Sequence, residues 1–238
     1  MHLRKITLLT QKYPTKQQYP FNLPILNQSS LVQFESPVTF FVGENGTGKS
    51  TLLEGIAQKC RIHIWQDTGR TRFKLNPYED ALYNFIKPEW TDGIVPGCFF
   101  ASQIFRHFAE ILDDWAHSDP GVLDYFGGNS LLTLSHGQSL MAFFKSRFKV
   151  KGLYLLDEPE TALSAKKQLK LLKLLQDMTA QGHAQFIIAT HSPILLACPN
   201  AKIYSFDHIP IKTIDYEQTE HYKIYRDFLN DREKYLNK

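Results

Sequence analysis

Residues 43–50 form a short glycine-rich stretch, Gly-Glu-Asn-Gly-Thr-Gly-Lys-Ser, between two segments of different character. The apolar run Val38–Val42 before it predicts a buried strand, and residues 51–57 after it predict a helix. Glycines accept backbone dihedrals that other residues avoid, so successive N–H groups can approach an anion. The order of strand, glycine loop and helix therefore predicts a binding site for nucleotide phosphates.

Each position of this loop has an expected task. The positive end of the following helix dipole favours phosphate, the ammonium group of Lys49 can reach the β- and γ-phosphates, and the hydroxyl of Ser50 is placed to ligate Mg²⁺. The residues expected to bind the nucleotide are Gly43, Glu44, Asn45, Gly46, Thr47, Gly48, Lys49, Ser50 and Thr51.

Two further groups of polar residues follow apolar runs. Asp157 and Glu158 end the run that starts at residue 152, and His191 comes shortly after the run 185–189. Ligands of open α/β sheets bind at the carboxyl ends of strands, so we expect Asp157 to hold Mg²⁺ and Glu158 to polarise the attacking water. His191 could contact the γ-phosphate. The alternatives are a plain turn at the strand end and a structural histidine.

The order of these motifs resembles that of the ATP-binding-cassette ATPases. GENGTGKS is followed by Leu-Ser-His-Gly-Gln at 134–138, by LLDEPE at 155–160, and by ATHSP at 189–193, at spacings similar to that family's. The resemblance spans about residues 3–206. It implies an α/β P-loop NTPase head with a mostly parallel central sheet, a small antiparallel β-layer and an inserted helical lobe.

The resemblance also implies roles for single residues. Glu158 matches the catalytic base, His191 the switch histidine and Lys49 the phosphate-loop lysine, while Ser50, Asp157 and Gln103 are the expected Mg²⁺ site. In this family the signature motif completes the ATP site of a second subunit, so ATP is expected to bridge a head-to-tail homodimer. The signature residues are Ser135, His136, Gly137 and Gln138. A simpler reading of Ser135 is a helix N-cap, and both readings can hold together.

Departures from the pattern bear on the process that hydrolysis would drive. Transport ATPases of this family typically carry a threonine, an aspartate and a glycine where this chain has Glu160, Ser164 and His136. The EPE and THSP motifs of this chain resemble instead those of the soluble chromosome-maintenance and DNA-repair heads and of the stand-alone "predicted ATPases" of the AAA family. A nucleic-acid or nuclease partner is therefore expected. A transporter's ATP-binding subunit and an ATP-gated scaffold with little turnover stay open as alternatives.

The remaining pattern predicts one domain over residues 1–238, with a helical lobe over about 76–150 that carries the signature motif. Strands are expected at 3–10 and 31–35 with a surface loop at 11–30 between them, and further strands at 152–156, 185–189, 203–206 and 211–215. Helices are expected at 80–86, 105–116, 138–148, 165–180 and 220–236.

Composition sets wider limits. The chain has 43% hydrophobic residues and a formal charge of +3, which allows a full core and does not demand a polyanionic partner. An odd number of cysteines without a C-x-x-C pair favours the reducing cytoplasm, and no segment reaches the length of a membrane helix, so no direct membrane insertion is expected. The basic segment 61–75 predicts an edge hairpin, with nucleic-acid contact as the alternative. Two basic clusters are interpreted as solvated faces, namely Lys166, Lys167, Lys170 and Lys173, and Lys145, Arg147, Lys149 and Lys151. Four aromatic residues are equal candidates for stacking on adenine, namely Tyr13, Tyr19, Phe21 and Phe34.

Overall fold

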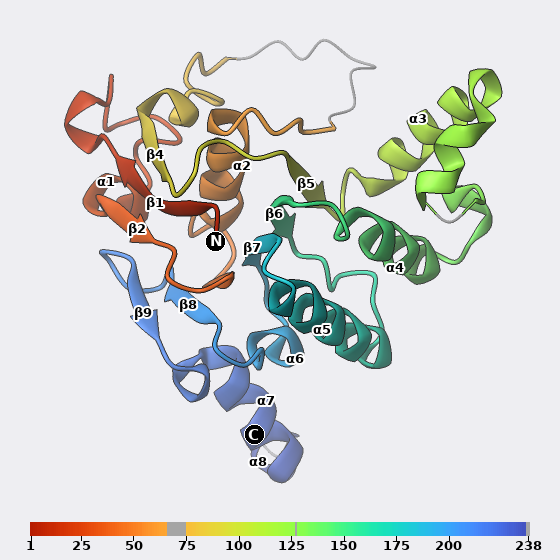
Figure 1. The fold of residues 1–238 in the computed structure, drawn as a ribbon. Coiled ribbons are helices and arrows are strands. Elements are labelled where there is room, and N and C mark those ends of the chain that lie inside the picture. Colours follow the sequence, from red (N-terminus) through yellow and green to blue (C-terminus); the bar gives the residue numbers. More distant parts are fainter. Residues whose placement is uncertain (66–74, 127, 237–238) are drawn as a thin grey trace.

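The chain builds two sheets of different size, shown in Figure 1. The computed structural model describes residues 1–65, 75–126 and 128–236. The larger sheet has the strand order β5-β6-β7-β3-β8-β9, and only the β8–β9 pair is antiparallel. Its strands are β3 (Val38–Val42), β5 (Gly97–Ala101), β6 (Gly152–Asp157), β7 (Ala184–Ala189), β8 (Lys202–Ser205) and β9 (Lys212–Ile214). The smaller sheet is antiparallel, in the order β2 (Leu31–Gln33), β1 (Leu3–Leu8), β4 (Ile86–Trp90). The predicted sheet and β-layer are both confirmed.

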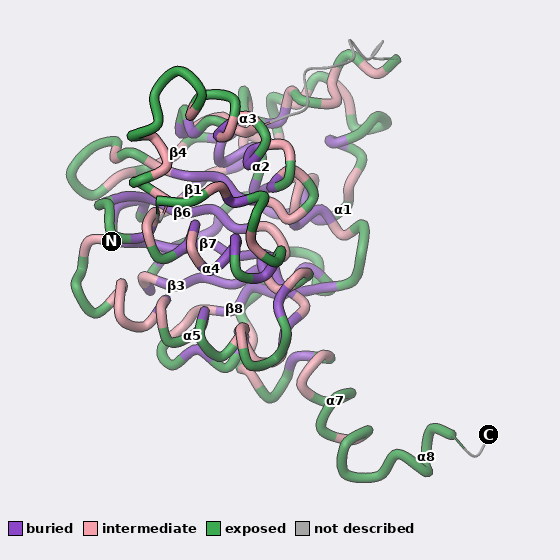
Figure 2. Tube along the Cα trace, turned by 90° about the vertical axis from the view of Figure 1, so that its right-hand side faces the viewer, coloured by how far each residue is buried: buried purple, intermediate pink, exposed green. Residues whose placement is uncertain are grey.

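Alternating side chains of the large sheet serve two cores. On β6, Leu153 and Leu155 belong to the core shared with α2 (Lys49–Lys59) and the small sheet. Tyr154 and Leu156 belong to the other core, which α4 (His136–Arg147), α5 (Ala165–Ala180) and α6 (Pro193–Leu196) cover. Because both faces are buried, the strands read as continuous apolar runs, as expected for a parallel sheet. Figure 2 shows these strands as the buried centre of the molecule.

The helical lobe is shorter than the sequence predicts. The helical assignment of residues 76–150 is wrong on its N-terminal side, because β4 and β5 lie within it and the helix expected at 80–86 is the 3-10 turn η2 (Leu82–Phe85). The lobe consists of α3 (Phe105–Ser118), η3 (Pro120–Phe126), η4 (Leu131–Thr133) and α4. Phenylalanines from α3 and α4 pack together and onto Phe100 of β5, which attaches the lobe to the sheet.

Other segments also differ from expectation. The surface loop predicted at 11–30 contains η1 (Thr10–Lys12) and α1 (Pro24–Gln28), and it buries Phe21, Ile25 and Leu26. The helix predicted at 220–236 is two helices, α7 (Glu220–Asn230) and α8 (Glu233–Leu236), which follow η5 (Tyr216–Gln218). Most of the basic segment 61–75 lies outside the described residues. In the described part of the chain no helix has the length and apolarity needed to cross a membrane.

One buried side chain joins the two sheets. Gln185 of β7 has no exposed surface, and its Oε1 accepts hydrogen bonds from the backbone N–H groups of His2 and Leu3, each at 2.8 Å. Its Nε2 donates to the backbone oxygen of Leu3 at 2.8 Å. The amide therefore satisfies three backbone groups of His2 and Leu3, at the point where the small sheet meets the large one.

We predict that Gln185→Leu lowers the free energy of unfolding by about 3 kcal/mol, because it leaves buried backbone donors and an acceptor without partners. Urea denaturation of the variant measures the loss. Gln33→Leu is the matched control, since Gln33 lies exposed on β2 and its replacement should change stability by no more than about 0.5 kcal/mol. Equal stability of the two variants would contradict this role of Gln185.

Candidate functional site

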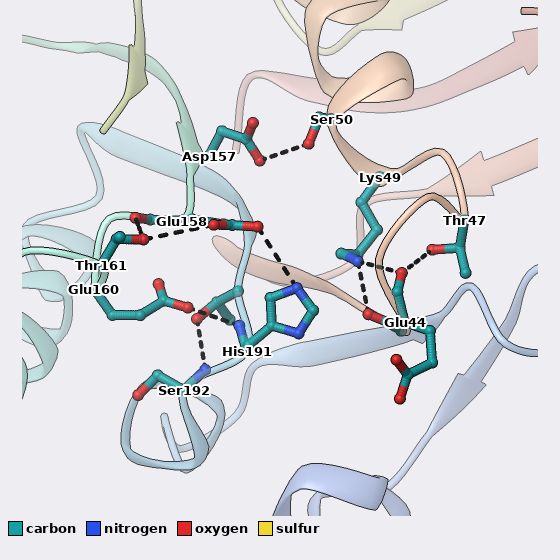
Figure 3. A network of polar contacts seen from close by, with 12 residues as sticks. Glu44, Thr47, Lys49, Ser50, Asp157, Glu158, Glu160, Thr161, His191 and Ser192 are labelled. Atoms are coloured by element: carbon teal, nitrogen blue, oxygen red, sulfur yellow. Dashed lines mark hydrogen bonds and ion pairs between the residues drawn. The ribbon is translucent and has the colours of Figure 1, made fainter. Parts of the chain in front are cut away.

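The strand register brings the predicted site residues to one edge of the large sheet. Asp157 at the end of β6 lies opposite Ala101 of β5 on one side and Ala189 of β7 on the other. Ala189 in turn lies opposite Phe41 of β3. The loops that follow these four strands therefore start at the same edge, as Figure 3 shows for the phosphate loop, Glu158 and His191.

The phosphate loop has the backbone conformation for which its glycines are required. Gly46 and Gly48 have φ angles of 80° and 100°, in the left-handed region that other residues rarely adopt. A Cβ atom on Gly48 would also lie 3.2 Å from side-chain atoms of Leu23 and Ile25. Gly48 is the N-cap of α2, so the helix predicted over residues 51–57 begins two residues earlier, at Lys49.

Lys49 is folded onto its own loop. Its buried ammonium group donates hydrogen bonds to the backbone oxygens of Gly43 at 2.6 Å and Glu44 at 2.8 Å. Burial lowers the pKa of Lys49, and the nearby carboxylates, Glu158 foremost, oppose that shift. The lysine is thus held at the mouth of the loop, where its charge faces several acidic side chains.

Ser50 and Asp157 meet across the edge of the sheet. The Ser50 hydroxyl donates to Asp157 Oδ1 at 3.1 Å. Burial raises the pKa of Asp157 to about 6, the negative charge of Glu158 adds to the rise, and the Ser50 hydrogen bond and Lys49 oppose it. A buried carboxylate next to a hydroxyl is a pair of hard oxygen donors of the kind that Mg²⁺ prefers, so these residues fit the expected ion.

Glu158 is held in a strained backbone conformation. Its φ angle is 47°, which is uncommon for a residue with a side chain. Its backbone N–H donates to the oxygen of Ala189 at 2.9 Å, and its own oxygen accepts from the Ser102 hydroxyl at 2.6 Å and from the Thr161 hydroxyl at 3.0 Å. Strain that surrounding contacts maintain in this way is typical of functional positions.

His191 lies between two glutamates. Its backbone N–H donates to Glu160 Oε1 at 2.7 Å, and its Nε2 is 3.6 Å from Glu158 Oε1, beyond hydrogen-bond distance. Among the described residues no group hydrogen-bonds to this buried Nε2 atom. Glu160, which the sequence singled out only as a departure from transporters, therefore positions the loop of His191.

The signature residues lie on the helical lobe. Ser135 caps α4, and its backbone N–H donates to the side chain of Gln138 at 3.0 Å, which completes a capping box. The ring of His136 packs against Phe105, and a Cβ on Gly137 would meet Lys167 Nζ at 2.7 Å. The described residues that line the pocket beside the phosphate loop include none of these four. The N-cap expectation is confirmed, and the structure does not bring the motif to this chain's own phosphate loop.

Gln103 occupies the turn after β5. Its side chain is exposed, and it follows Ser102, whose hydroxyl holds the backbone of Glu158. Since Ala101 pairs with Asp157, Gln103 starts from the edge of the sheet that carries the acidic pair. No contact between Gln103 and Asp157 is present among the described residues, so the role of Gln103 in holding Mg²⁺ stays a prediction.

The structure distinguishes among the four aromatic candidates that the sequence left equal. Phe21 and Phe34 are buried, and Tyr13 packs on Phe21. Tyr19 lines a pocket of about 230 Å³ beside the phosphate loop, and its hydroxyl is 2.9 Å from Thr51 Oγ1. Only tertiary structure could single out Tyr19, because nothing in its local sequence differs from the others.

The family models and curated relatives that match this chain are described as AAA domains or ATP-binding proteins. Residues 137–197 match a family model described as "AAA domain, putative AbiEii toxin, Type IV TA system", and residues 22–60 match one described as "AAA domain". A "Probable siderophore transport system ATP-binding protein YusV" of Bacillus subtilis is 26% identical over 73% of this chain and 68% of the relative. The "Macrolide export ATP-binding/permease protein MacB" of Psychrobacter cryohalolentis is 25% identical, and the chain spans 28% of its length.

Solved structures share the fold at low identity. A metal-chelate type ABC transporter in an inward-facing conformation aligns with a TM-score of 0.55 and 19% identity, over 94% of this chain and 88% of that one. An SmcHead bound to the C-winged helix domain of ScpA aligns with a TM-score of 0.53 and 13% identity, over 92% and 99%. The cbiO1 protein of Clostridium perfringens gives 0.52 and 17%, over 98% and 97%. At these identities the matches show a shared fold, that of ATP-binding-cassette ATPase heads.

Proposed function

We propose that this protein binds Mg-ATP and hydrolyses it as a dimer that closes around the nucleotide. The observation that carries the proposal is the shared sheet edge, where the phosphate loop, the Ser50–Asp157 pair, Glu158 and His191 meet. Phosphoryl transfer to water requires positioning and charge stabilisation more than covalent chemistry. These residues supply both.

Lys49 would contact the phosphates of ATP directly, and oxygen atoms of nearby side chains would hold the Mg²⁺ ion that accompanies them. On binding, the ammonium group of Lys49 exchanges the loop carbonyls that it now contacts for the β- and γ-phosphates. Ser50 and Asp157 would hold Mg²⁺, with Gln103 reaching in from the turn after β5. When bound, the ion offsets negative charge on the β- and γ-phosphates.

Glu158 and His191 would act at the γ-phosphate. The Glu158 carboxylate orients the attacking water and accepts its proton. The Nε2 atom of His191 is buried without a hydrogen-bond partner among the described residues, so a phosphate oxygen would satisfy it. A histidine that gains a hydrogen bond only while the γ-phosphate is present can sense its loss.

The signature motif would act on the ATP of a second copy. It lies at the N-terminus of α4 on the helical lobe, and its residues are absent from the described lining of the pocket at the phosphate loop. A head-to-tail pair would place Ser135 and Gly137 of each copy against the ATP of the other. Loss of the γ-phosphate would then separate the two surfaces.

For the process that closure drives, we favour DNA maintenance or defence with a nucleic-acid or nuclease partner. Glu160 supports this choice, because it holds the loop of His191 at a position where transport ATPases typically carry a threonine. The second candidate is an ATP-binding subunit of a membrane transporter, which the names of the curated relatives favour. Hydrolysis that rises with duplex DNA supports the first, and co-purification of a membrane-spanning subunit supports the second.

We predict that Glu158→Gln lowers kcat for ATP hydrolysis by about 10²–10⁴-fold, because the amide cannot accept the proton of the attacking water. The same variant should form a stable dimer with ATP in light scattering, and Lys49→Ala should abolish both hydrolysis and dimer. Glu35→Gln is the control for the loss of a carboxylate. Glu35 is exposed, lies in the segment before β3 and forms an ion pair with Lys202. A Glu158→Gln protein that stays monomeric with ATP would rule out the dimer, and an unchanged rate would rule out the base.

We predict that Asp157→Asn stabilises the nucleotide-free protein by about 2 kcal/mol at pH 7.5 while it weakens Mg-ATP binding. The pKa of Asp157 rises from the ordinary 3.8 to about 6 on folding. Between these values the folded state keeps a proton that the unfolded state has lost, so wild-type stability falls as pH rises through this window and stays lower above it. Urea denaturation should show the gain at pH 7.5 and a smaller gain at pH 5. An equal effect at both pH values would contradict the charge as its cause.

We predict that Tyr19→Ala raises KM for ATP about tenfold with little change in kcat, because it removes a ring for adenine to stack on. Tyr19→Phe keeps the ring and loses only the hydroxyl that contacts Thr51, so its KM should stay within about twofold. Tyr83→Ala is a control for an exposed tyrosine elsewhere. Equal KM values for Tyr19→Ala and wild type would exclude Tyr19 from the adenine site.

A further inference from the structure

A second histidine lies directly behind His191. His221, in the first turn of α7, places its Nε2 atom 2.9 Å from His191 Nδ1, and the two ring centroids are 4.9 Å apart. The pair comes from segments 30 residues apart in sequence. His191 thus has one ring nitrogen toward Glu158 and the other engaged by His221.

The distance of 2.9 Å requires one proton between the two nitrogens. Two protonated imidazoles would oppose each other N–H to N–H, so at least one ring is neutral. Burial is the leading cause that lowers the pKa of both histidines, and the charge of Lys49 lowers both further. Glu158 and Glu44 oppose the shift at His191, and Glu44, Asp207 and Glu220 oppose it at His221. Both histidine rings are therefore neutral, and one hydrogen bond joins them.

Two proton arrangements satisfy this bond, and they differ at the catalytic edge. If His191 donates from Nδ1, its Nε2 is a bare lone pair that faces the Glu158 carboxylate, which is repulsive. If His221 donates from Nε2, the proton of His191 resides on Nε2 and faces that carboxylate favourably. The first arrangement would also leave a buried N–H at His221 Nδ1, an atom to which no described residue hydrogen-bonds.

We infer that His221 is a positioning residue that donates to His191 Nδ1 and so keeps the proton of His191 on Nε2, ready to donate to a phosphate oxygen. The inference rests on the proposed function, which places the γ-phosphate at His191 Nε2. A partner on the far nitrogen commonly selects the tautomer of a functional histidine. Here the partner is itself a histidine, carried by the C-terminal helix.

The structure fixes His221 in place from several sides. The Tyr216 hydroxyl donates to the backbone oxygen of Pro193 at 3.1 Å, which ties the start of this segment to the loop of His191. Thr219, nearly fully buried, caps α7 by accepting from the Tyr222 N–H at 3.3 Å. The rings of Tyr216 and Tyr222 pack at 4.6 Å. His221 therefore meets His191 from a braced helix start, which is what selection of a tautomer requires.

The test compares two amides that differ in reach. In His221→Gln the amide nitrogen can occupy the place of Nε2 and donate to His191, whereas the shorter side chain in His221→Asn cannot reach it. We expect kcat of the Asn variant to fall about tenfold and that of the Gln variant to stay within about threefold of wild type. Affinity for a non-hydrolysable ATP analogue should fall in the Asn variant, while affinity for ADP should not change, because ADP has no γ-phosphate. Thermal melting confirms that both variants fold.

Two controls separate this inference from the proposed function. In a His191→Ala background, His221→Asn should cause no further loss, since the two residues act as one unit. Nitrogen-15 NMR of the histidine rings reads the tautomer of His191 without hydrolysis, and we expect the Nε2–H form in wild type and its loss in His221→Asn. A wild-type Nδ1–H form, or equal defects in the Gln and Asn variants, would overturn the inference. Wild-type hydrolysis by His191→Ala would overturn the proposed role of His191 while the NMR result still decides the tautomer.

Discussion

The parallel register of β6, β7 and β3 is the constraint on which the rest of the site depends. Backbone hydrogen bonds place Asp157 opposite Ala189, and Ala189 opposite Phe41, so that three loops leave the sheet at one level. Because side chains alternate, a shift of one residue in β6 would exchange the faces of Leu155 and Leu156 and move buried side chains into the wrong core. The apolar cores therefore fix the register, and the register fixes where the polar residues of the site stand.

The site costs stability that the two cores offset. It holds a buried lysine, a carboxylate whose pKa burial raises to about 6 and a glutamate with a positive φ angle. Each of these features is unfavourable without a ligand. A nucleotide with its cation would neutralise the acidic pair, engage Lys49 and satisfy His191 Nε2. Under the proposed function, the features that destabilise the free protein would favour the bound state, a trade-off common at functional sites.

Sequence reasoning succeeded where structure is local. The helix expected at 165–180 is α5, and the phosphate loop follows its strand and opens its helix as predicted, because glycine spacing and periodicity encode such features directly. The strands β4 and β5 were not predicted, because they are short and lie in a region whose apolar residues otherwise recur at helical spacing. Sequence reasoning also missed the buried Phe21 in a polar, proline-containing segment, where no period marks the core. Tyr19 could not be singled out from four aromatic candidates, and His221 was missed altogether, because their roles depend on which distant residue each contacts.

The histidine pair changes what a γ-phosphate contact can do in this chain. His191 is held through its backbone by Glu160 from the loop after β6, and through its ring by His221 from α7. Glu160 is two residues from Glu158 in the sequence, whereas α7 reaches the site through the His221 contact and through the neighbouring Tyr216, which bonds to Pro193. Figure 2 shows α7 and α8 extending from the body with most of their residues exposed. A displacement of α7 would therefore lengthen the His191–His221 bond before it disturbed the phosphate loop, and the proton on His191 Nε2 would no longer be fixed. The position of α7 and the tautomer of His191 are thus linked through the contact between His191 and His221.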